Sequence, residues 1–308
     1  MITTVTLNTA VDKAYIVDKI EIGQVVRVKS CTNTPGGKGL NVAKVVRLCG
    51  EEVTATGFLG GHSGAYIEEL LDKLKVSHRF LHIAGETRSC INILEQGGKS
   101  TEFLEPGVPV SQGDCQRFME AFDQIVQESS VITISGSLPE GIQNDIYAKL
   151  IHMCKGAGKR VILDTSGIPL EKGLKAGPAI IKPNIDELET LLGASVSKLE
   201  DVIAGALKLR DRGPKVVVIS LGSEGAVMAT EKGVYYGRPP LISAVNTVGC
   251  GDSMTAALAV GLYRGYGIQE ILRYGVAVSA ANAMSLQTGH FRQEDLNHIL
   301  PRVSVQML

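Results

Sequence analysis

The alternation of short β-branched runs with helical stretches is the feature of this sequence that most constrains its fold. Several runs are almost continuous in valine and isoleucine, which is typical of parallel strands covered by helices on both faces. The runs that predict strands are Ile2–Leu7, Val53–Gly57, Val131–Ser135, Arg160–Asp164, Ala179–Lys182 and Val216–Ser220. The stretches that predict helices are Leu40–Leu48, Gly64–Leu74, Asp114–Gln127, Ile142–Lys155, Ile185–Leu192 and Leu199–Arg212, with a mainly helical region after Asp252. This order predicts a parallel sheet with helices on both faces.

Composition places the chain among ordinary globular proteins. It has 308 residues, of which 44% are hydrophobic and 20% charged, and its formal net charge is −1. Disorder needs low hydrophobicity and high net charge, so it is excluded. At about 150 residues per domain, the length indicates one large domain or two smaller ones. A near-neutral chain has no general attraction for nucleic acid or an anionic membrane, so any anion that it binds needs a local site.

The cysteines and the first residues favour a cytoplasmic protein. The six cysteines contain no Cys-x-x-Cys pair and no histidine at ligand spacing, so we expect buried thiols in a reducing cytosol rather than zinc or disulfides. The N-terminus lacks the basic region and cleavage site of a signal peptide. No apolar stretch approaches the roughly 20 residues that a membrane span needs. We expect neither nucleic acid nor a membrane as a partner.

Two segments interrupt the alternation of strand and helix. Residues 11–35 and 87–104 are extended and alternating, without a helix between their strands. Within the second segment, Arg88–Leu94 and Thr101–Leu104 flank Gly97-Gly98, which predicts a hairpin. The two segments form either a small β lid over the main sheet or a pair of ordinary edge strands, and periodicity favours neither.

Polar clusters follow four of the predicted parallel strands. They are Gly136-Ser137-Leu138-Pro139, Asp164-Thr165-Ser166-Gly167, Lys182-Pro183-Asn184 and Leu221-Gly222-Ser223-Glu224-Gly225. Ligands of open parallel sheets bind outside the carboxyl ends of the strands. One such cluster would be routine turn chemistry, but four on one sheet edge predict a large cleft.

The strongest local signal is Thr247-Val248-Gly249-Cys250-Gly251-Asp252-Ser253, which leads into the apolar stretch Met254–Tyr263. Backbone amides at a helix start, together with the positive end of its dipole, form an anion site. A carboxylate there repels phosphate, so Asp252 suits a base that takes a proton from a hydroxyl attacking that phosphate. The simpler interpretation is an N-cap, which is a common use of aspartate.

A second glycine loop is Pro35-Gly36-Gly37-Lys38-Gly39-Leu40-Asn41-Val42-Ala43. It is not a Walker A motif because no serine or threonine follows the lysine, and no Gly-x-Gly-x-x-Gly follows a strand. The loop could approach a polar substrate, with Lys38 near an anion and Asn41 bonded to hydroxyls. Glycine-rich helix starts are often only structural, and that alternative stays open.

The third signal is Lys182-Pro183-Asn184-Ile185-Asp186-Glu187. Asn184 and Glu187 fall on one face of a helix that begins there. Their oxygens suit Mg²⁺, which usually keeps waters and takes phosphate oxygens as further ligands. The alternative is a capping box, in which the two side chains satisfy the helix start.

Taken together, these motifs resemble the phosphofructokinase B group of the ribokinase-like carbohydrate kinases. The resemblance covers essentially the whole chain, and the motifs are specific in combination rather than singly. The two signatures are Gly36-Gly37-Lys38-Gly39-x-Asn41 and Val248-Gly249-Cys250-Gly251-Asp252. The supporting motifs, in chain order, are Leu7-Asn8-Thr9-Ala10-x-Asp12, Ser135-Gly136-Ser137-Leu138-Pro139, Lys182-Pro183-Asn184-x-x-Glu187 and Ser220-Leu221-Gly222.

The resemblance implies a single ribokinase-like α/β domain over residues 1–308. It would have a doubly wound, mostly parallel sheet of about eight strands and a small β lid, formed by about 11–35 and 87–104, that often makes a dimer contact. Arg27, Lys38 and Arg88 are similar to residues of the kinases of phosphorylated ketohexoses. The implied ligands are ATP, Mg²⁺ and a sugar phosphate, and the implied assembly is a homodimer through the lid.

The resemblance also implies a role for each matching residue. The sugar hydroxyls would contact Asp12, Asn41 and the backbone of Gly37, Lys38 and Gly39. The sugar's phosphate would contact Arg27, Lys38, Arg88 and Ser137. The nucleotide and its metal would contact Lys182, Asn184, Glu187 (to Mg²⁺ through water), Ser220, Gly222, Gly225 and Asn282. The catalytic set would be the Gly249, Cys250 and Gly251 amides, with Asp252 as the base.

Two departures from the group's usual motifs leave this set intact. Cys250 stands where alanine is usual, and Thr9 where proline is usual. The favoured acceptor is fructose 1-phosphate, phosphorylated at its 6-hydroxyl as by a 1-phosphofructokinase, because residues 247–254 are more similar to those enzymes. The alternative is tagatose-6-phosphate kinase, which residues 87–91 and 101–105 resemble more. The less favoured alternatives are a 6-phosphofructokinase, a non-catalytic sugar-phosphate sensor and a nicotinamide-dependent dehydrogenase, the last lacking the phosphate fingerprint of its class.

Overall fold

The computed structural model of the protein describes residues 1–96 and 99–308. Within these residues, a ten-stranded sheet has the order β14-β13-β12-β11-β10-β9-β8-β1-β4-β5. The seven strands from β11 to β5 in this order are parallel: β11 (Val216–Ser220), β10 (Ile180–Ile181), β9 (Arg160–Asp164), β8 (Val131–Ser135), β1 (Ile2–Thr6), β4 (Val53–Leu59) and β5 (Ser77–His82). The antiparallel strands β12 (Ala226–Thr230), β13 (Gly233–Arg238) and β14 (Ser304–Met307) extend the sheet. The predicted parallel sheet is thus confirmed, with two strands more than the resemblance implies.

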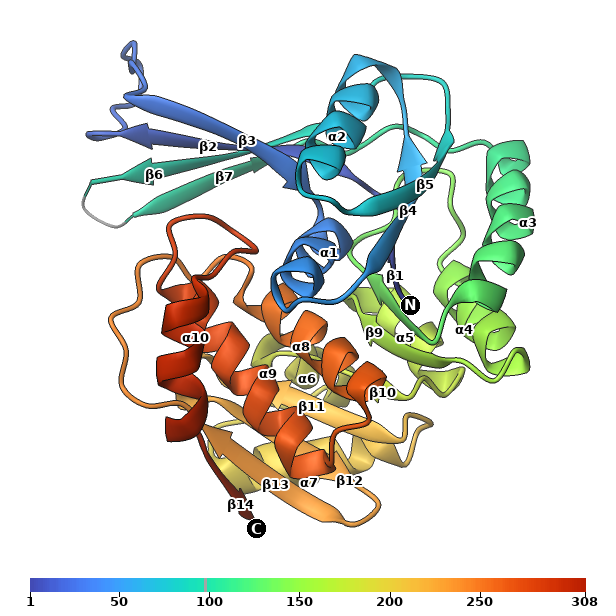
Figure 1. Cartoon of the computed structure of the whole chain (residues 1–308), viewed down its shortest axis with the longest axis vertical. Coiled ribbons are helices and arrows are strands. Elements are labelled where there is room, and N and C mark those ends of the chain that lie inside the picture. Colours follow the sequence, from blue (N-terminus) through green and yellow to red (C-terminus); the bar gives the residue numbers. More distant parts are fainter. Residues whose placement is uncertain (97–98) are drawn as a thin grey trace.

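Helices cover both faces of this sheet (Figure 1). One layer contains α1 (Lys38–Leu48), α2 (Gly61–Lys73), α8 (Cys250–Arg264), α9 (Ile268–Ala283) and α10 (Gln293–Ile299). The other contains α3 (Gln112–Glu128), α4 (Ile146–Gly156), α5 (Gly167–Lys175), α6 (Ile185–Leu192) and α7 (Leu199–Arg210). Short 3-10 turns lie at Gly222–Glu224 and Leu300–Arg302. Neighbouring strand residues contribute to opposite layers, as Val131 and Ile132 do, because side chains alternate along a strand.

The largest differences between predicted and observed bounds lie in three places. Helix α4 begins at Ile146 rather than Ile142, because residues 139–145 form turns in which the Ile142 amide bonds to the Pro139 carbonyl. Helix α8 begins at Cys250, so the glycine loop enters its first turn. The region after Asp252 contains α8, α9 and α10, but residues 284–292 form a loop between α9 and α10, and β14 returns to the sheet edge.

The two irregular segments form a second sheet that projects from the main body (Figure 1). Its order is β3-β2-β6-β7, with β2 (Ala10–Val17), β3 (Ser30–Gly36), β6 (Ser89–Glu95) and β7 (Ser100–Leu104). β6 and β7 pair antiparallel, as the predicted hairpin requires, whereas its Gly97-Gly98 turn lies outside the described residues. The strands are therefore not edge strands of the main sheet.

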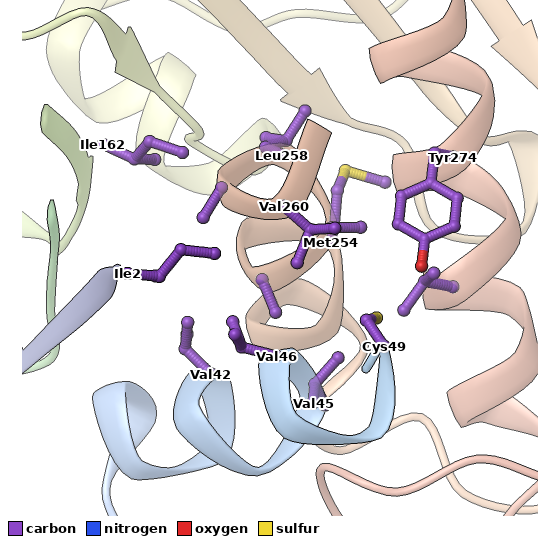
Figure 2. Close-up of a cluster of buried hydrophobic side chains, with 14 of the residues drawn as sticks. Ile2, Val42, Val45, Val46, Cys49, Ile162, Met254, Leu258, Val260 and Tyr274 are labelled. Carbon is purple, nitrogen blue, oxygen red and sulfur yellow. The ribbon is translucent and has the colours of Figure 1, made fainter. Parts of the chain in front are cut away.

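Helices α1 and α8 pack side by side over the parallel strands. Figure 2 shows Val42, Val45 and Val46 of α1 directed toward Met254 and Val260 of α8, and all five are buried. This packing fixes the starts of the two helices relative to each other, and both starts carry the glycine loops singled out above. Over the described part of the chain, no helix has the length and apolarity that crossing a membrane requires.

Candidate active site

The start of α8 is built to bind an anion. Gly249 is its N-cap residue, with φ of 80° in the left-handed region that glycine adopts readily. A Cβ atom at Gly249 would lie 2.7 Å from the Thr288 side chain, so glycine also allows a close approach there. The amides of Gly251 and Asp252 fall in the first turn, where they have no intrahelical acceptor. A Cβ atom at Gly251 would lie 3.3 Å from Lys182 Nζ, so a cation stands beside these amides.

Asp252 does not cap the helix, so the simpler interpretation of this residue is wrong. The N-cap is Gly249, and no side-chain cap is present. The Asp252 carboxylate instead accepts a hydrogen bond of 2.8 Å from Asn41 Nδ2 and is 6% exposed. Burial raises its pKa, although Lys38 and the Asn41 hydrogen bond oppose this. A buried carboxylate with a raised pKa is suited to accept a proton.

Helix α1 brings Asn41 to this carboxylate. The helix begins after Gly37, whose φ is 94°, and a Cβ atom at Gly39 would lie 2.2 Å from Thr6 Oγ1 on β1. The glycine loop therefore has a structural role, in placing α1 close to β1. Among the described residues, the Asn41 Oδ1 atom is buried and has no hydrogen-bond partner. That orphan acceptor is available to a ligand's hydroxyl group.

Asp12 approaches the same site from β2 in the second sheet. A Cβ atom at Gly36 would lie 2.1 Å from the Asp12 carboxylate, so glycine at that position makes room for the acid. Burial raises the pKa of Asp12 to about 6, with Asp252 adding to the rise and Lys44 and Arg88 opposing it. Two carboxylates and two cations thus interact at the junction of the sheets.

A second group of polar residues gathers at the base of the second sheet. Asn8 Nδ2 donates to Ser137 Oγ at 3.2 Å, and Arg88 Nη2 donates to the Asn8 carbonyl at 3.1 Å. Lys38 lies alongside, since a Cβ atom at Gly136 would be 3.7 Å from Lys38 Cβ. The structure therefore brings together Lys38, Arg88 and Ser137. The buried Arg88 Nε atom has no partner among the described residues.

Arg27 is not brought to this group. It lies in the exposed loop between β2 and β3, beside Asp18, Glu21 and Val25. This loop is at the end of the second sheet that is remote from α1 and α8 (Figure 1).

Asp164, at the end of β9, joins the two lysines of the site. Its Oδ1 atom is 3.4 Å from Lys38 Nζ, and its Oδ2 atom is 3.4 Å from Lys182 Nζ. Thr255 Oγ1 donates to Oδ2 at 2.8 Å. Burial acts to raise the pKa of Asp164, but Lys182, Lys38 and the Thr255 hydrogen bond together lower it. In turn, Asp164 raises the pKa of Lys38, which is therefore a permanent cation.

The capping-box interpretation of Asn184 and Glu187 is confirmed. The Glu187 amide donates to Asn184 Oδ1 at 2.8 Å, and the Asn184 amide donates to Glu187 Oε2 at 3.0 Å. The Glu187 charge nevertheless lies near enough to the site to contribute to the raised pKa of Lys38. Across residues 1–96 and 99–308, no group of three histidine, cysteine or acidic side chains is arranged to hold a metal ion.

The residues predicted for the nucleotide have varied surroundings. Asn184 and Ser220 form a bridge between the chain ends of β10 and β11, and Gly222 begins the 3-10 turn beyond it. Gly225 is required by the fold, since a Cβ atom there would lie 2.0 Å from the Gly237 carbonyl. Asn282 is 0% exposed.

The side chain of Asn282 is committed to the protein itself. Its Nδ2 atom donates to the Val248 carbonyl at 3.1 Å and to Cys250 Sγ at 3.4 Å, and its Oδ1 atom accepts from the His290 amide. Asn282 thereby supports the glycine loop of residues 247–251, which we call the anion loop. Burial raises the pKa of the Cys250 thiol, so this cysteine is a packed thiol rather than a reactive thiolate.

Sequence reasoning missed four residues of this site: Asn8, Lys44, Asp164 and Thr255. Lys44 gave a usable signal, because it interrupts the apolar run Val42–Val46 three residues after Asn41. Asp164 ended a predicted strand among other polar residues. Its role depends on two lysines distant in sequence, and local patterns do not show that.

Two groups of anion-binding donors lie near one carboxylate. Lys38, Arg88 and Ser137 form one group, and Lys182 with the α8 amides forms the other. Asp252, near Asn41 and Asp12, interacts with the lysines of both groups. Such a site can hold a phosphorylated molecule by its phosphate and present a hydroxyl to the base, opposite a second phosphate.

Comparison with known proteins identifies a family and a fold for the chain. The profile of the pfkB family carbohydrate kinases matches residues 5–294. The tagatose-6-phosphate kinase of Staphylococcus epidermidis is 39% identical over 308 residues, which is 99% of each chain.

Two solved structures share the fold over almost the whole chain. Phosphofructokinase-2 of Escherichia coli in complex with potassium has a TM-score of 0.91 at 29% identity, covering 98% of both chains. Another structure of that protein is its tetrameric inhibited form. A possible 1-phosphofructokinase of Thermotoga maritima has a TM-score of 0.91 at 25% identity, covering 100% of this chain and 99% of that one. The ribokinase-like fold implied by the motifs is confirmed.

Proposed function

The chain belongs to the pfkB family of carbohydrate kinases, and from that premise we propose that it transfers a phosphoryl group from ATP to a ketohexose monophosphate. The oxygen of the acceptor's free hydroxyl attacks the γ-phosphorus, and the bond from that phosphorus to ADP breaks. The hydroxyl proton passes to the Asp252 carboxylate. The products are ADP and a ketohexose bisphosphate.

One observation carries this proposal: the buried Asp252 stands at the first turn of α8 instead of capping it. Its raised pKa lets it receive a proton from an alcohol. The amides of the same turn and the neighbouring Lys182 are placed to stabilise charge on the transferring group. The first turn of α8 thus contains both the proposed base, Asp252, and the proposed anion-binding amides.

A phosphate already on the acceptor explains the second set of cations. Lys38 and Arg88 converge with Ser137 near Asn8. The Arg88 guanidinium donates to two backbone carbonyls rather than to a carboxylate, so a phosphate on the acceptor would supply its counter-charge. Arginine binds phosphate through its planar fork. The orphan Asn41 Oδ1 atom and the Asp12 carboxylate would accept hydrogen bonds from the sugar's hydroxyls.

ATP would extend from the α8 amides past Lys182 toward Ser220 and Gly222. Glu187 fits an accompanying Mg²⁺, because only one oxygen of its carboxylate is used in the capping box and its charge acts on Lys38. An ion that keeps several waters needs only one or two carboxylates. When bound, Mg²⁺ would supply charge neutralisation to the nucleotide phosphates.

Two acceptors fit this chemistry. Fructose 1-phosphate, favoured by residues 247–254, carries its phosphate at C1 and reacts at the 6-hydroxyl. Tagatose 6-phosphate carries its phosphate at C6 and reacts at the 1-hydroxyl, and the Staphylococcus epidermidis relative favours it. In both, the phosphate and the reacting hydroxyl lie at opposite ends of a ketohexose. The sugars differ at C4, so the contacts of Asp12 and Asn41 to ring hydroxyls would separate them.

We further propose that the second sheet acts as a lid and as a contact between two copies of this chain in the cytoplasm. Asp12 on β2 and Arg88 next to β6 belong to both the lid and the site. Closure of the lid would carry Arg27 toward the acceptor's phosphate. The exposed Ile22 and Val25 of the same loop are apolar side chains that a second copy would cover.

A substrate panel tests the proposed function. ADP release would be measured with fructose 1-phosphate, tagatose 6-phosphate, fructose 6-phosphate and the unphosphorylated sugars, each with ATP and Mg²⁺. We expect turnover with fructose 1-phosphate or tagatose 6-phosphate to exceed that with the free sugars by orders of magnitude. Turnover of free sugars alone would overturn the phosphate pocket. No turnover of any acceptor would leave a sugar-phosphate sensor as the function.

A further inference from the structure

Lys44 is a buried cation that none of the motifs assigns to the reaction. It lies on α1, three residues after Asn41, and is 7% exposed. Its neighbours in sequence, Val42 to Val46, pack into the core between α1 and α8 (Figure 2). A lysine is almost never buried to this degree without a partner.

The direct partner of Lys44 is a segment from the other end of the chain. Lys44 Nζ donates to the Thr288 carbonyl at 3.1 Å. A Cβ atom at Gly289 would lie 3.0 Å from Lys44 Cε and 3.3 Å from Asn41 Cα. The segment 286–290 therefore lies directly against the α1 turn that carries the Asn41 amide.

The other side of the same segment contacts the anion loop. A Cβ atom at Gly249 would lie 2.7 Å from the Thr288 side chain and 3.0 Å from the Gly289 amide. Asn246, just before the anion loop, donates to the Leu286 carbonyl at 3.0 Å. Segment 286–290 is thus held between α1 and the loop that begins α8.

The charged groups that face Lys44 come from three elements. Asp12 lies on β2 and Asp252 on α8. Burial lowers the pKa of Lys44 to about 8, and the charges of these two carboxylates oppose that shift. His290, the last residue of segment 286–290, has its pKa lowered by burial and by Lys44. The charges of Lys38 and Lys182 lower the pKa of Asp252, and that of Asp164 raises it. Lys44 is therefore one of three lysines whose charge acts on Asp252.

We propose that Lys44 is a positioning residue of the phosphoryl-transfer site, which holds segment 286–290 against α1 and balances the charges of Asp12 and Asp252. This role rests on the proposed kinase function, since it acts through the base and the acceptor-binding acid. The tether keeps Gly249 in place behind the anion loop. The charge favours the ionised form of both carboxylates, which is the form that accepts a hydrogen bond or a proton.

Three substitutions separate the tether from the charge. Lys44→Met removes both, Lys44→Gln keeps a donor for the Thr288 carbonyl without a charge, and Lys44→Arg keeps both. The matched control is Lys155→Met. Lys155 also donates to a backbone carbonyl, that of Ala176 at 2.7 Å, but on α4 in the opposite helix layer.

Two measurements read out the two parts of the proposal. The first is the pH profile of kcat/KM for the sugar phosphate: its acidic limb should move up by about one pH unit in Lys44→Met and Lys44→Gln, because a neighbouring positive charge lowers a carboxylate's pKa. Lys44→Arg should restore the wild-type limb. The second is hydrogen exchange over residues 286–290, which should accelerate at least tenfold in Lys44→Met and stay slow in Lys44→Arg and Lys155→Met.

Either part can fail on its own. An unshifted acidic limb in Lys44→Met and Lys44→Gln would refute the charge role, and unchanged exchange over 286–290 in Lys44→Met would refute the tether. If Lys44→Met does not fold, Lys44→Gln is used for the pH profile. The tether is then tested by comparing hydrogen exchange over residues 286–290 in Lys44→Gln with that in Lys44→Arg. A wild-type protein that phosphorylates no acceptor would overturn the proposed function alone, because the exchange measurement needs no activity.

Discussion

Replacing Asp164 with asparagine tests whether one buried carboxylate holds both lysines of the site. The change preserves size and removes one negative charge that lies 3.4 Å from Lys38 Nζ and from Lys182 Nζ. At that distance the attraction to Lys182 is about 5 kcal/mol for an effective dielectric constant of about 20. The Lys38 side chain is 42% exposed, so solvent screening reduces its share to about 1 kcal/mol or less.

The net loss of stability is smaller than these attractions, because the asparagine no longer has a charge to desolvate. Removing one partner of a buried ion pair costs about 3–5 kcal/mol. We expect the lower end of that range, about 3 kcal/mol, since Lys38 can turn to solvent. In a chain of this length such a loss lowers Tm by about 5 °C.

The pH dependence of this loss has a definite sign. The pKa of Asp164 is lowered in the folded protein, so its contribution is complete above the unfolded value of about 3.9 and is lost as pH falls through the folded value. The stability difference between wild type and Asp164→Asn should therefore be full at pH 7 and should close only in strong acid.

Urea unfolding and thermal scans with and without inorganic phosphate measure the effect. Without Asp164, the two lysines have no shared counter-charge, so phosphate should raise Tm more in Asp164→Asn than in wild type. The KM values for both substrates should change, because the proposed function assigns Lys38 to the acceptor's phosphate and Lys182 to the nucleotide. Thr255→Val is the matched control: it removes the 2.8 Å hydrogen bond to Asp164 but no charge. Wild-type stability and KM values in Asp164→Asn would refute the reasoning.

Three further substitutions and profiles address the reaction itself. Asp252→Asn should lower kcat by about 10²–10⁴-fold, with the KM for ATP little changed. If steady-state kinetics of this variant gave the wild-type kcat, Asp252 would not be the base. Arg88→Ala should raise the KM for the sugar phosphate about 10-fold or more without affecting ATP, whereas Arg79→Ala, which removes an exposed ion pair with Glu128, should change neither. The kcat/KM of the free enzyme should fall below about pH 6, where Asp12 becomes protonated and loses acceptor capacity. If the acidic limb of this pH profile stayed unmoved in Asp12→Asn, another group would be responsible for the limb.

The sequence predicted the parts of the fold that depend on local pattern. Buried parallel strands are nearly continuous apolar runs, and the predicted runs at 131–135, 160–164 and 216–220 coincide with β8, β9 and β11. The capping box at Asn184 was also predictable, because both partners lie within one turn. The short strands β12 to β14 pair antiparallel at one edge, and no comparable pattern separates them from the surrounding loops.

The site was predictable where chemistry is carried by a motif, and not where it is carried by strand order. Asp252 stood out as a carboxylate after two glycines. Asp164 acquires its role because β9 lies between β8 and β10 in the sheet, which places it between Lys38 and Lys182. Lys44 acquires its role from Thr288, 244 residues away. These pairings arise only once the sheet is assembled.

The balance of charge within the site bears on how a nearly neutral chain binds two anions. Its cations are Lys38, Lys44, Lys182 and Arg88, and its acids are Asp12, Asp164, Asp252 and Glu187. Before substrates bind, each lysine already faces a carboxylate, so the site presents no large positive field. Selectivity for phosphate must then come from directed donors: the amides of the α8 turn, the Arg88 guanidinium and the lysines that Asp164 holds in place. Asp164 contacts both Lys38 and Lys182, so under the proposed function a single carboxylate would couple the acceptor's pocket to that of the nucleotide.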